Sequence, residues 1–104
     1  MLLVREVMFC KPGQVRPMVE KFLAMNKLGA KVGMPKMRIL TDFVGERYWT
    51  IVAEMEVANV AEFEKMMQGP GGGSSEDMKE MEKIMKGYHD HVEYGKREIY
   101  KIEG

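Results

Sequence analysis

The strongest constraint on the fold is an alternation of hydrophobicity along residues 47–57, RYWTIVAEMEV. From residue 48 on, the even positions mix polar, charged and apolar residues, whereas the odd positions are all apolar: Trp49, Ile51, Ala53, Met55 and Val57. A period of two residues is typical of a β-strand that packs one face on a core. The pattern therefore predicts a sheet with one buried face, and it places Trp49 on that face.

Two further strand-like segments precede this one. Residues 2–10, LLVREVMFC, are rich in β-forming residues and are followed by the turn sequence KPG. Residues 36–44, KMRILTDFV, are separated from the alternating segment by Gly45 and Glu46. Such a short connection between two strand-like segments predicts a hairpin.

A helical period begins at Gln14, between the first two strand segments. With about 100° of rotation per residue, one side of this helix collects Val15, Met18, Val19, Phe22 and Met25. Pro17 leaves two alternatives: the helix begins near Arg16 with the proline in its first turn, or one early hydrogen bond is lost. The glycines and the proline at 29–35 are expected to end it.

The second half of the chain predicts a broken helix and a last strand. Asn59 and Glu62 have the spacing of an N-cap for a short helix, VAEFEKMM, before QGPGGGSS interrupts the chain at 68–75. A second helical piece follows, with an apolar stripe at Met78, Met81, Met85, Tyr88 and Val92. We expect Gly95 to end this piece before the final strand, KREIYKI.

This order of elements is the split βαβ pattern. It predicts an α+β fold, a ferredoxin-like βαββαβ sandwich whose two helices cover one face of a four-stranded antiparallel sheet. The second helix is broken by the Gly-rich loop at 69–75, for which a flexible break and a lid over a cleft are both open. A length of 104 residues fits a single domain, residues 1–104.

The opposite face of the predicted sheet combines opposite charges with apolar side chains. We assign to it Arg38, Asp42, Glu54 and Arg97, together with Leu40, Tyr48, Val52 and Ile99. An antiparallel sheet can leave such a face in water. We favour the alternative, a two-fold contact with a second copy of the chain, because mixed charges can pair with themselves across such an interface.

Charge and cysteine content narrow the class of protein. Sixteen basic and sixteen acidic residues leave a formal net charge of zero, so we expect neither nucleic acid nor a membrane as partner. The single Cys10 allows no internal disulfide, the N-terminus lacks the pattern of a signal peptide, and no apolar run approaches the roughly 20 residues of a membrane span. A cytoplasmic protein is the expectation, and nothing in the sequence predicts a cofactor.

Three segments give the chain a resemblance to a known family. REVMFCKPGQV, RILTDFVGERYWTIVAEMEVANVAEFE and VEYGKREIY resemble the blocks of the NIPSNAP-like branch of the dimeric α/β-barrel superfamily. The resemblance implies a homodimer in which two ferredoxin-like protomers join their sheets into one barrel. The wider superfamily includes antibiotic-biosynthesis monooxygenases, haem-degrading enzymes and muconolactone isomerase, so the fold leaves the chemistry open.

Two polar residues are candidates for catalysis. Asn26 lies about 20° from Val15 on the first helix, inside its apolar stripe, where an amide either bonds the backbone or orients a ligand. His89 lies at the border of the second stripe, as a surface residue or as a proton shuttle in a cleft. His91 lies on the opposite border, and no further histidine or cysteine completes a zinc set, so we predict no metal site.

Four apolar residues are candidates for lining a ligand pocket between helix and sheet: Trp49, Tyr88, Met85 and Phe22. The first functional hypothesis is a homodimer that binds a small apolar molecule, with monooxygenase or isomerase activity carried by His89 and Asn26. The second is a dimeric structural or interaction module without catalysis. A pocket lined jointly by Asn26, Trp49 and His89 would favour the first hypothesis.

Overall fold

The computed structural model describes residues 1–67 and 75–104. The elements follow in the order β1 (Leu2–Cys10), α1 (Val15–Lys31), β2 (Arg38–Thr41), β3 (Thr50–Val57), α2 (Val60–Met67), α3 (Ser75–Met85), the 3₁₀ turn η1 (Tyr88–Asp90) and β4 (Val92–Lys101). This confirms the order expected from the sequence. Residues 69–74 of the Gly-rich loop lie outside the described residues, so neither interpretation of that loop is addressed.

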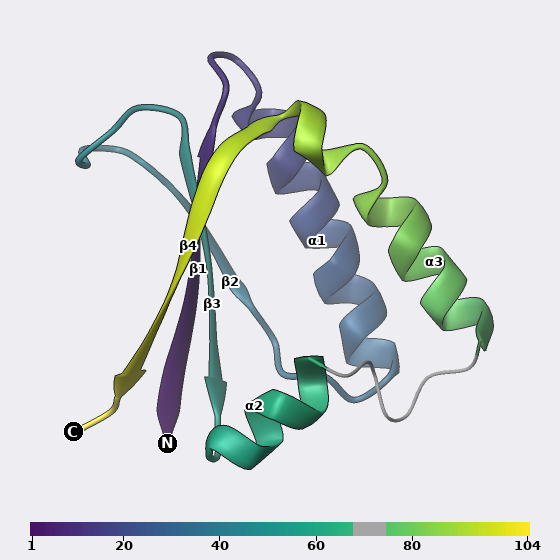
Figure 1. Cartoon of the computed structure of the whole chain (residues 1–104). Helices are drawn as coiled ribbons and strands as arrows, with labels where there is room; N and C mark the ends of the chain where they lie inside the picture. Colours follow the sequence, from purple (N-terminus) through teal and green to yellow (C-terminus); the bar gives the residue numbers. More distant parts are fainter. Residues whose placement is uncertain (68–74) are drawn as a thin grey trace.

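The four strands form one antiparallel sheet in the order β2-β3-β1-β4. Figure 1 shows α1 and α3 side by side on one face of this sheet, with α2 near the end of β3. Both termini lie at the same edge of the picture, below the sheet. The predicted ferredoxin-like α+β sandwich is therefore confirmed.

The core lies between the sheet and the helices. Its larger cluster joins the end of β1, the middle of α1 and the start of β3, with Cys10, Met18, Val19, Phe22, Ile51 and Ala53. A smaller cluster, under α2, contains Val4, Val57 and Phe63. The alternation along β3 is confirmed from Ile51 onward, because Ile51, Ala53 and Val57 are buried on this helix-covered face.

Local residue choices explain where the helices start and end. Pro17 is the third residue of α1, in the first turn, where its missing N–H has no intrahelical partner to lose. Gly33 follows the end of α1 with φ +80°, a conformation that glycine adopts without steric strain. Asn59 caps α2 as predicted, because its Oδ1 accepts a hydrogen bond from the Glu62 N–H at 2.9 Å.

The predicted hairpin is confirmed, because β2 pairs antiparallel with β3, but its connection is longer than Gly45 and Glu46. A loop of residues 42–49 connects β2 to β3, and it is anchored by Asp42, whose Oδ1 accepts a hydrogen bond from the Thr50 N–H at 2.8 Å. Trp49 belongs to this loop with φ +61° and is 43% exposed. The expectation that Trp49 packs on the buried face of the sheet is therefore wrong, because the strand begins only at Thr50.

The helix expected to run to Gly95 ends before Tyr88 and Val92, the last two residues of its predicted apolar stripe. Gly87 takes φ +81° after α3 ends at Met85, and the chain then makes the turn η1 and enters β4 at Val92. Gly95 lies inside β4, where a Cβ would come within 3.0 Å of the Val7 carbonyl oxygen. Close strand contact, not helix termination, explains this glycine.

Arg97 and Ile99 lie on the helix-covered face, not on the opposite one. Arg97 pairs with Glu6 across β1 and β4, and Glu6 pairs with Ala53 across β1 and β3. Paired residues point to the same face of a sheet. Arg97 accordingly forms an ion pair with Glu6, and its guanidinium lies over the ring of Phe63 in α2.

Candidate functional site

A small apolar cavity lies between α1, the sheet and the end of α3. Its volume is about 130 Å³, and we call it the methionine pocket because five methionines line it: Met25, Met34, Met37, Met55 and Met85. Phe22, Asn26, Gly29 and Pro35 complete the lining. None of these residues carries a titratable side chain, so a ligand in the pocket would contact apolar groups and polarizable sulfur atoms and no charged group.

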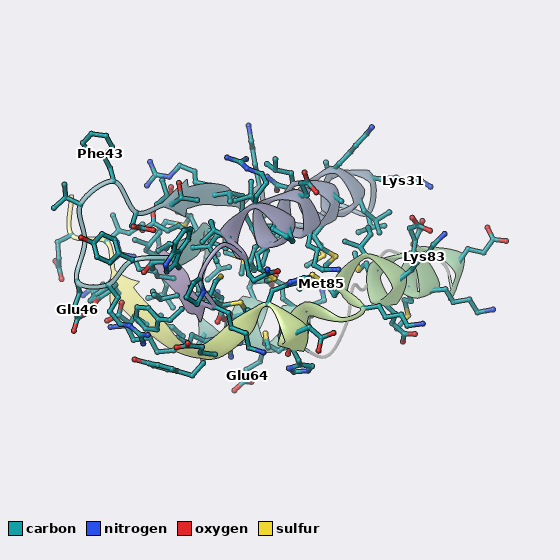
Figure 2. The ribbon with its side chains drawn as sticks, turned by 90° about the horizontal axis from the view of Figure 1, so that it is seen from above. Lys31, Phe43, Glu46, Glu64, Lys83 and Met85 are labelled. Carbon is teal, nitrogen blue, oxygen red and sulfur yellow. The ribbon has the colours of Figure 1, made fainter. Side chains whose placement is uncertain are left out.

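Four elements bring the methionines together. Phe22, Met25, Asn26 and Gly29 follow the helical spacing of three and four residues and therefore share one side of α1. Met34 and Met37 come from the segment between α1 and β2, Met55 from β3, and Met85 is the last residue of α3. Figure 2 places Met85 in the space between α1 and α3, with sulfur atoms of other residues close by.

The side chain of Asn26 holds the backbone of Met37, in the wall of the pocket, by two hydrogen bonds. Its Nδ2 donates a hydrogen bond to the Met37 carbonyl oxygen at 2.7 Å, and its Oδ1 accepts one from the Met37 N–H at 2.9 Å. These two bonds fix the chain immediately before β2. The arrangement corresponds to the backbone-bonding alternative for Asn26, and both polar ends of its amide are already engaged.

His89, Tyr88 and Trp49 lie away from the methionine pocket. His89 is exposed, and its ring stacks on Tyr88 with the ring centroids 3.9 Å apart. Tyr88 itself packs against the larger core cluster. Trp49 lines a separate depression with Val15, Thr41, Asp42 and Tyr48. Of the predicted site residues, the structure thus brings together Phe22, Asn26 and Met85, but not Trp49, Tyr88 or His89.

His91 has a structural contact of its own. Its Nδ1 lies 2.7 Å from the Gln14 Oε1, which ties the start of β4 to the start of α1. Within residues 1–67 and 75–104, no three side chains of histidine, cysteine, aspartate or glutamate are grouped to hold a metal ion. The two histidines therefore do not form a shared metal site in the described part of the chain.

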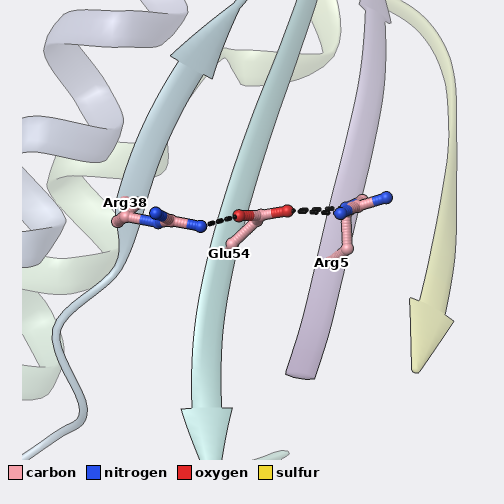
Figure 3. A network of polar contacts seen from close by, with 3 residues as sticks. All are labelled: Arg5, Arg38 and Glu54. Carbon is pink, nitrogen blue, oxygen red and sulfur yellow. Dashed lines mark hydrogen bonds and ion pairs between the residues drawn. The ribbon is translucent and has the colours of Figure 1, made fainter. Parts of the chain in front are cut away.

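The face of the sheet away from the helices, which we call the open face, carries a network of charges. Arg5 Nη2 and Arg38 Nη2 lie 2.7 Å from Glu54 Oε2 and Oε1 respectively, so one carboxylate bridges β1 and β2 from β3 (Figure 3). Glu54 is only 4% exposed. Burial alone raises the pKa of its carboxyl, but the hydrogen bonds and charges of Arg38 and Arg5 outweigh burial and hold the pKa below its ordinary value.

A hollow of about 330 Å³ extends over the open face beneath the β2–β3 loop. Arg47 from this loop lies over the rings of Phe9 and Tyr94, at 4.8 and 5.1 Å from their centroids, and pairs with Glu93 at 3.0 Å. The hydrogen bond to Glu93 is the largest contribution raising the pKa of Arg47. The hollow is lined by both signs of charge, so it has no clear preference for an anion or a cation.

Cys10 is the remaining nucleophilic side chain of interest, and it is unsuited to reaction. It is buried in the larger core cluster. Burial, followed by the negative charge of Asp42, raises the pKa of its thiol. A raised pKa keeps the sulfur protonated at neutral pH, and the thiol is a poor nucleophile in that form.

Sequence reasoning found only part of the pocket. Met34 lies in a segment without periodicity, Met37 falls in the strand-like segment 36–44, and the strand alternation predicts that Met55 lies in the core. The available signal was composition, namely twelve methionines in 104 residues, several of them at helical spacing. Nothing in the sequence alone indicated which five would meet.

Comparisons with known proteins agree on the fold. No protein-family model matches the chain, and no curated protein matches it. Among solved structures, it is similar to an uncharacterised NIPSNAP-like domain protein from Burkholderia xenovorans, with 8% identity, a TM-score of 0.72 and coverage of 98% of this chain and 85% of that one.

Two further structures extend the comparison. An antibiotic biosynthesis monooxygenase matches with 13% identity and a TM-score of 0.67 over 100% of both chains. A dimeric protein of unknown function and ferredoxin-like fold from Bacteroides fragilis matches with 14% identity and a TM-score of 0.60, over 97% of this chain and 96% of that one. At such identities the similarity establishes architecture and not activity. The chain therefore shares the ferredoxin-like fold found in NIPSNAP-like and antibiotic-biosynthesis-monooxygenase structures.

Proposed function

We propose that this protein is a homodimer that binds one small apolar molecule per chain in the methionine pocket. The observation that carries the proposal is a cavity of about 130 Å³ lined by five methionines and without a titratable side chain. An apolar protein cavity of roughly 150 Å³ takes up benzene, so this volume suits a ligand of one small ring. Methionine adapts to the shape of a ligand through its three rotatable bonds.

Catalysis on such a ligand, as a cofactor-independent monooxygenase or isomerase, is the finer hypothesis. The similarity to an antibiotic biosynthesis monooxygenase supports it. The lining of the pocket does not supply a general acid or base, since His89 is exposed outside it and both ends of the Asn26 amide bond Met37. Binding is therefore better supported by the geometry than proton transfer to or from a substrate.

Benzene is a suitable probe for the pocket. A ligand that binds only the folded protein raises the free energy of unfolding, by about 1.4 kcal/mol at ten times its dissociation constant. Gly29→Ala adds a methyl group toward the Cβ of Met34, 3.5 Å away, and narrows the pocket. We expect benzene to stabilise the wild type and to stabilise Gly29→Ala much less.

Gly45→Ala is the matched control, because it adds the same methyl group in the β2–β3 loop, away from the methionine pocket. Benzene should stabilise Gly45→Ala as much as the wild type. Equal stabilisation of all three proteins would show that benzene binds elsewhere. No stabilisation of the wild type would contradict the proposed function and leave the interaction module as the alternative.

A second copy of the chain is the proposed partner for the open face. By strand register this face presents Arg5, Arg38 and Lys96 alongside Glu54, Glu56 and Glu98, a balance of charge that a two-fold axis can pair. The same face exposes apolar surface at Leu40, Tyr94 and Tyr100. The dimeric ferredoxin-like protein from Bacteroides fragilis supports this assembly.

The β2–β3 loop supports the same proposal. Phe43 at its tip is 99% exposed and Val44 is 89% exposed, which is costly for apolar side chains in a monomer. Figure 1 shows this loop projecting on the side of the sheet opposite the helices, and Figure 2 shows Phe43 standing away from the rest of the chain. A partner on the open face would cover these side chains.

Light scattering tests the dimer directly. We expect twice the chain mass of 12.0 kDa at micromolar concentration. Val52→Lys places a charge in the middle of the open face and should give the mass of one chain. Val60→Lys, the same exchange at an exposed position of α2, should leave the dimer intact. A wild-type mass of 12.0 kDa would contradict the assembly.

A further inference from the structure

The methionine pocket is also a cluster of soft ligands. Five of its nine lining residues carry a thioether sulfur, and none carries a charge. Thioethers are neutral, polarizable donors that bind hard cations such as Mg²⁺ or Ca²⁺ poorly but suit Cu(I). We propose that this pocket binds one Cu(I) ion through three or more methionine sulfurs.

The methionines approach the cavity from different directions, as ligands of one ion must. Met25 comes from α1, Met34 and Met37 from the segment before β2, Met55 from β3 and Met85 from the end of α3. All five side chains are half-buried, so an ion can reach them without unfolding of the core. Their flexibility allows the sulfur atoms to turn toward a common point.

Other metal ions and other sites fit less well. In the described part of the chain, the histidine, cysteine and carboxylate side chains form no group of three that could hold Zn²⁺ or a harder ion. The prediction of no metal site from the sequence concerned histidine and cysteine as zinc ligands, whereas the ligands proposed here are thioethers. Cys10 lies in the core and does not line the pocket. Since no carboxylate balances the charge of the ion there, we expect weaker binding than at thiolate sites.

This inference uses the same cavity as the proposed function but does not depend on an organic ligand. An apolar molecule needs the empty volume, whereas Cu(I) needs the sulfur atoms. Replacing methionine by leucine keeps an apolar side chain of similar size and removes only the donor. The two ideas can therefore fail separately.

Ag(I) is a redox-inert probe for the site. The affinity for Cu(I) is then measured by competition with the chelator bicinchoninate. In a Cys10→Ala background, which removes the thiol, Ag(I) is titrated into protein labelled with ¹³C on the methionine methyl groups. We expect one ion to bind per chain and to shift the methyl resonances of the five pocket methionines. The resonances of Met1 and Met78, which are 60% and 46% exposed and lie outside the pocket lining, should not shift.

Two triple variants, one with leucine at pocket methionines and one with leucine at other methionines, test whether Cu(I) binding depends on the pocket sulfur atoms. Met25→Leu, Met55→Leu and Met85→Leu combined should weaken Cu(I) binding by at least the roughly 10- to 100-fold that loss of an outer-shell partner costs. The same exchange at Met8, Met67 and Met78, outside the pocket lining, should leave the affinity unchanged. Benzene should still stabilise the pocket variant.

Three results would overturn the Cu(I) site: no saturable binding, shifts as large at Met1 and Met78 as in the pocket, or equal affinity of the two triple variants. If the pocket variant does not fold, the methyl shifts of the Cys10→Ala protein on addition of Ag(I) still show whether the ion binds in the methionine pocket. Benzene stabilisation without pocket binding of Ag(I) refutes the metal site alone. Pocket binding of Ag(I) without benzene stabilisation refutes the apolar ligand alone.

Discussion

The two faces of the sheet use neighbouring residues of the same strand for opposite purposes. Ile51 is fully buried on the helix-covered face, and three residues later Glu54 is almost as buried on the open face. Ile51 is held by packing in the larger core cluster. Glu54 is held by two arginines from the strands on either side, Arg5 and Arg38.

Because one face is apolar and the other charged, the two faces suit different binding partners. The helix-covered face offers adaptable apolar surface, which discriminates weakly by shape and suits a small ligand. The open face offers charges in fixed positions, which favour a partner with a complementary pattern. We therefore propose the first face for the ligand and the second for another copy of the chain. The following substitutions test that separation in order of decreasing effect.

The largest effect is expected at Ile51. Ile51→Ala removes fully buried side-chain volume and should lower the free energy of unfolding by about 3 kcal/mol. Val52→Ala, one residue away and half-buried on the open face, should lower it by about 1 kcal/mol or less within one chain. Urea unfolding at a fixed protein concentration measures both. Equal losses would show that the two faces are not energetically distinct in the way described.

The next largest difference in the free energy of unfolding is expected between Asn26 and His89, the two residues predicted from the sequence to be catalytic. Asn26→Ala removes both hydrogen bonds to Met37 and should lower the free energy of unfolding by about 2 kcal/mol. His89→Ala, at an exposed position, should change it by less than about 0.5 kcal/mol. A large loss at His89 with none at Asn26 would reverse the roles inferred from the structure.

Glu54 gives the open face a pH-dependent contribution. Because the folded-state pKa of Glu54 is lowered, its stabilisation is fully present above the unfolded-state pKa of about 4.3 and is lost as the pH falls through the folded-state value. Glu54→Gln should therefore cost about 1 to 2 kcal/mol at pH 7. The difference from wild type should shrink in unfolding experiments taken below pH 4.

Glu64→Gln is the control for that experiment, since Glu64 is exposed on α2, away from the open face. Its effect should stay within about 0.5 kcal/mol at every pH. A difference between Glu54→Gln and wild type that does not depend on pH would show that the arginines do not stabilise the ionised carboxylate.

The smallest effects are expected at two glycines near the end of α1. Gly29→Ala lies in the helix with room for a Cβ and should raise the free energy of unfolding by about 0.5 to 1 kcal/mol. Gly33→Ala, at φ +80°, should lower it by about 1 kcal/mol despite the open space around it. Thermal unfolding with opposite shifts in midpoint would confirm the pair, and shifts of the same sign would contradict it.

Periodicity was sufficient to predict the order of the elements. The stripe along α1 and the alternation from Ile51 to Val57 depend only on spacing, and spacing is determined by helix and strand geometry. Trp49 could not be placed this way, because the left-handed conformation at Trp49 moves it out of the strand. Gly87 likewise follows the end of α3, although the apolar stripe continues in the sequence at Tyr88 and Val92.

The candidate site was less accessible from sequence than the fold. Phe22 and Asn26 share a helix face and could be grouped by spacing, but Met37 meets them through long-range contacts, its backbone bonds to Asn26 among them. Such long-range contacts depend on how the loop before β2 packs, and a loop has no period. The same reason separates Trp49 and His89 from the pocket to which they were assigned.

Binding of an apolar ligand in the methionine pocket can be measured from the ¹³C methyl spectrum of methionine-labelled protein during a benzene titration. The ring of a bound benzene shifts nearby methyl resonances. We expect saturable shifts of the methyl resonances of the five pocket methionines, Met25, Met34, Met37, Met55 and Met85, and none for Met1 and Met78. Shifts that do not saturate, or that are as large at Met1 and Met78 as in the pocket, would contradict binding in this pocket.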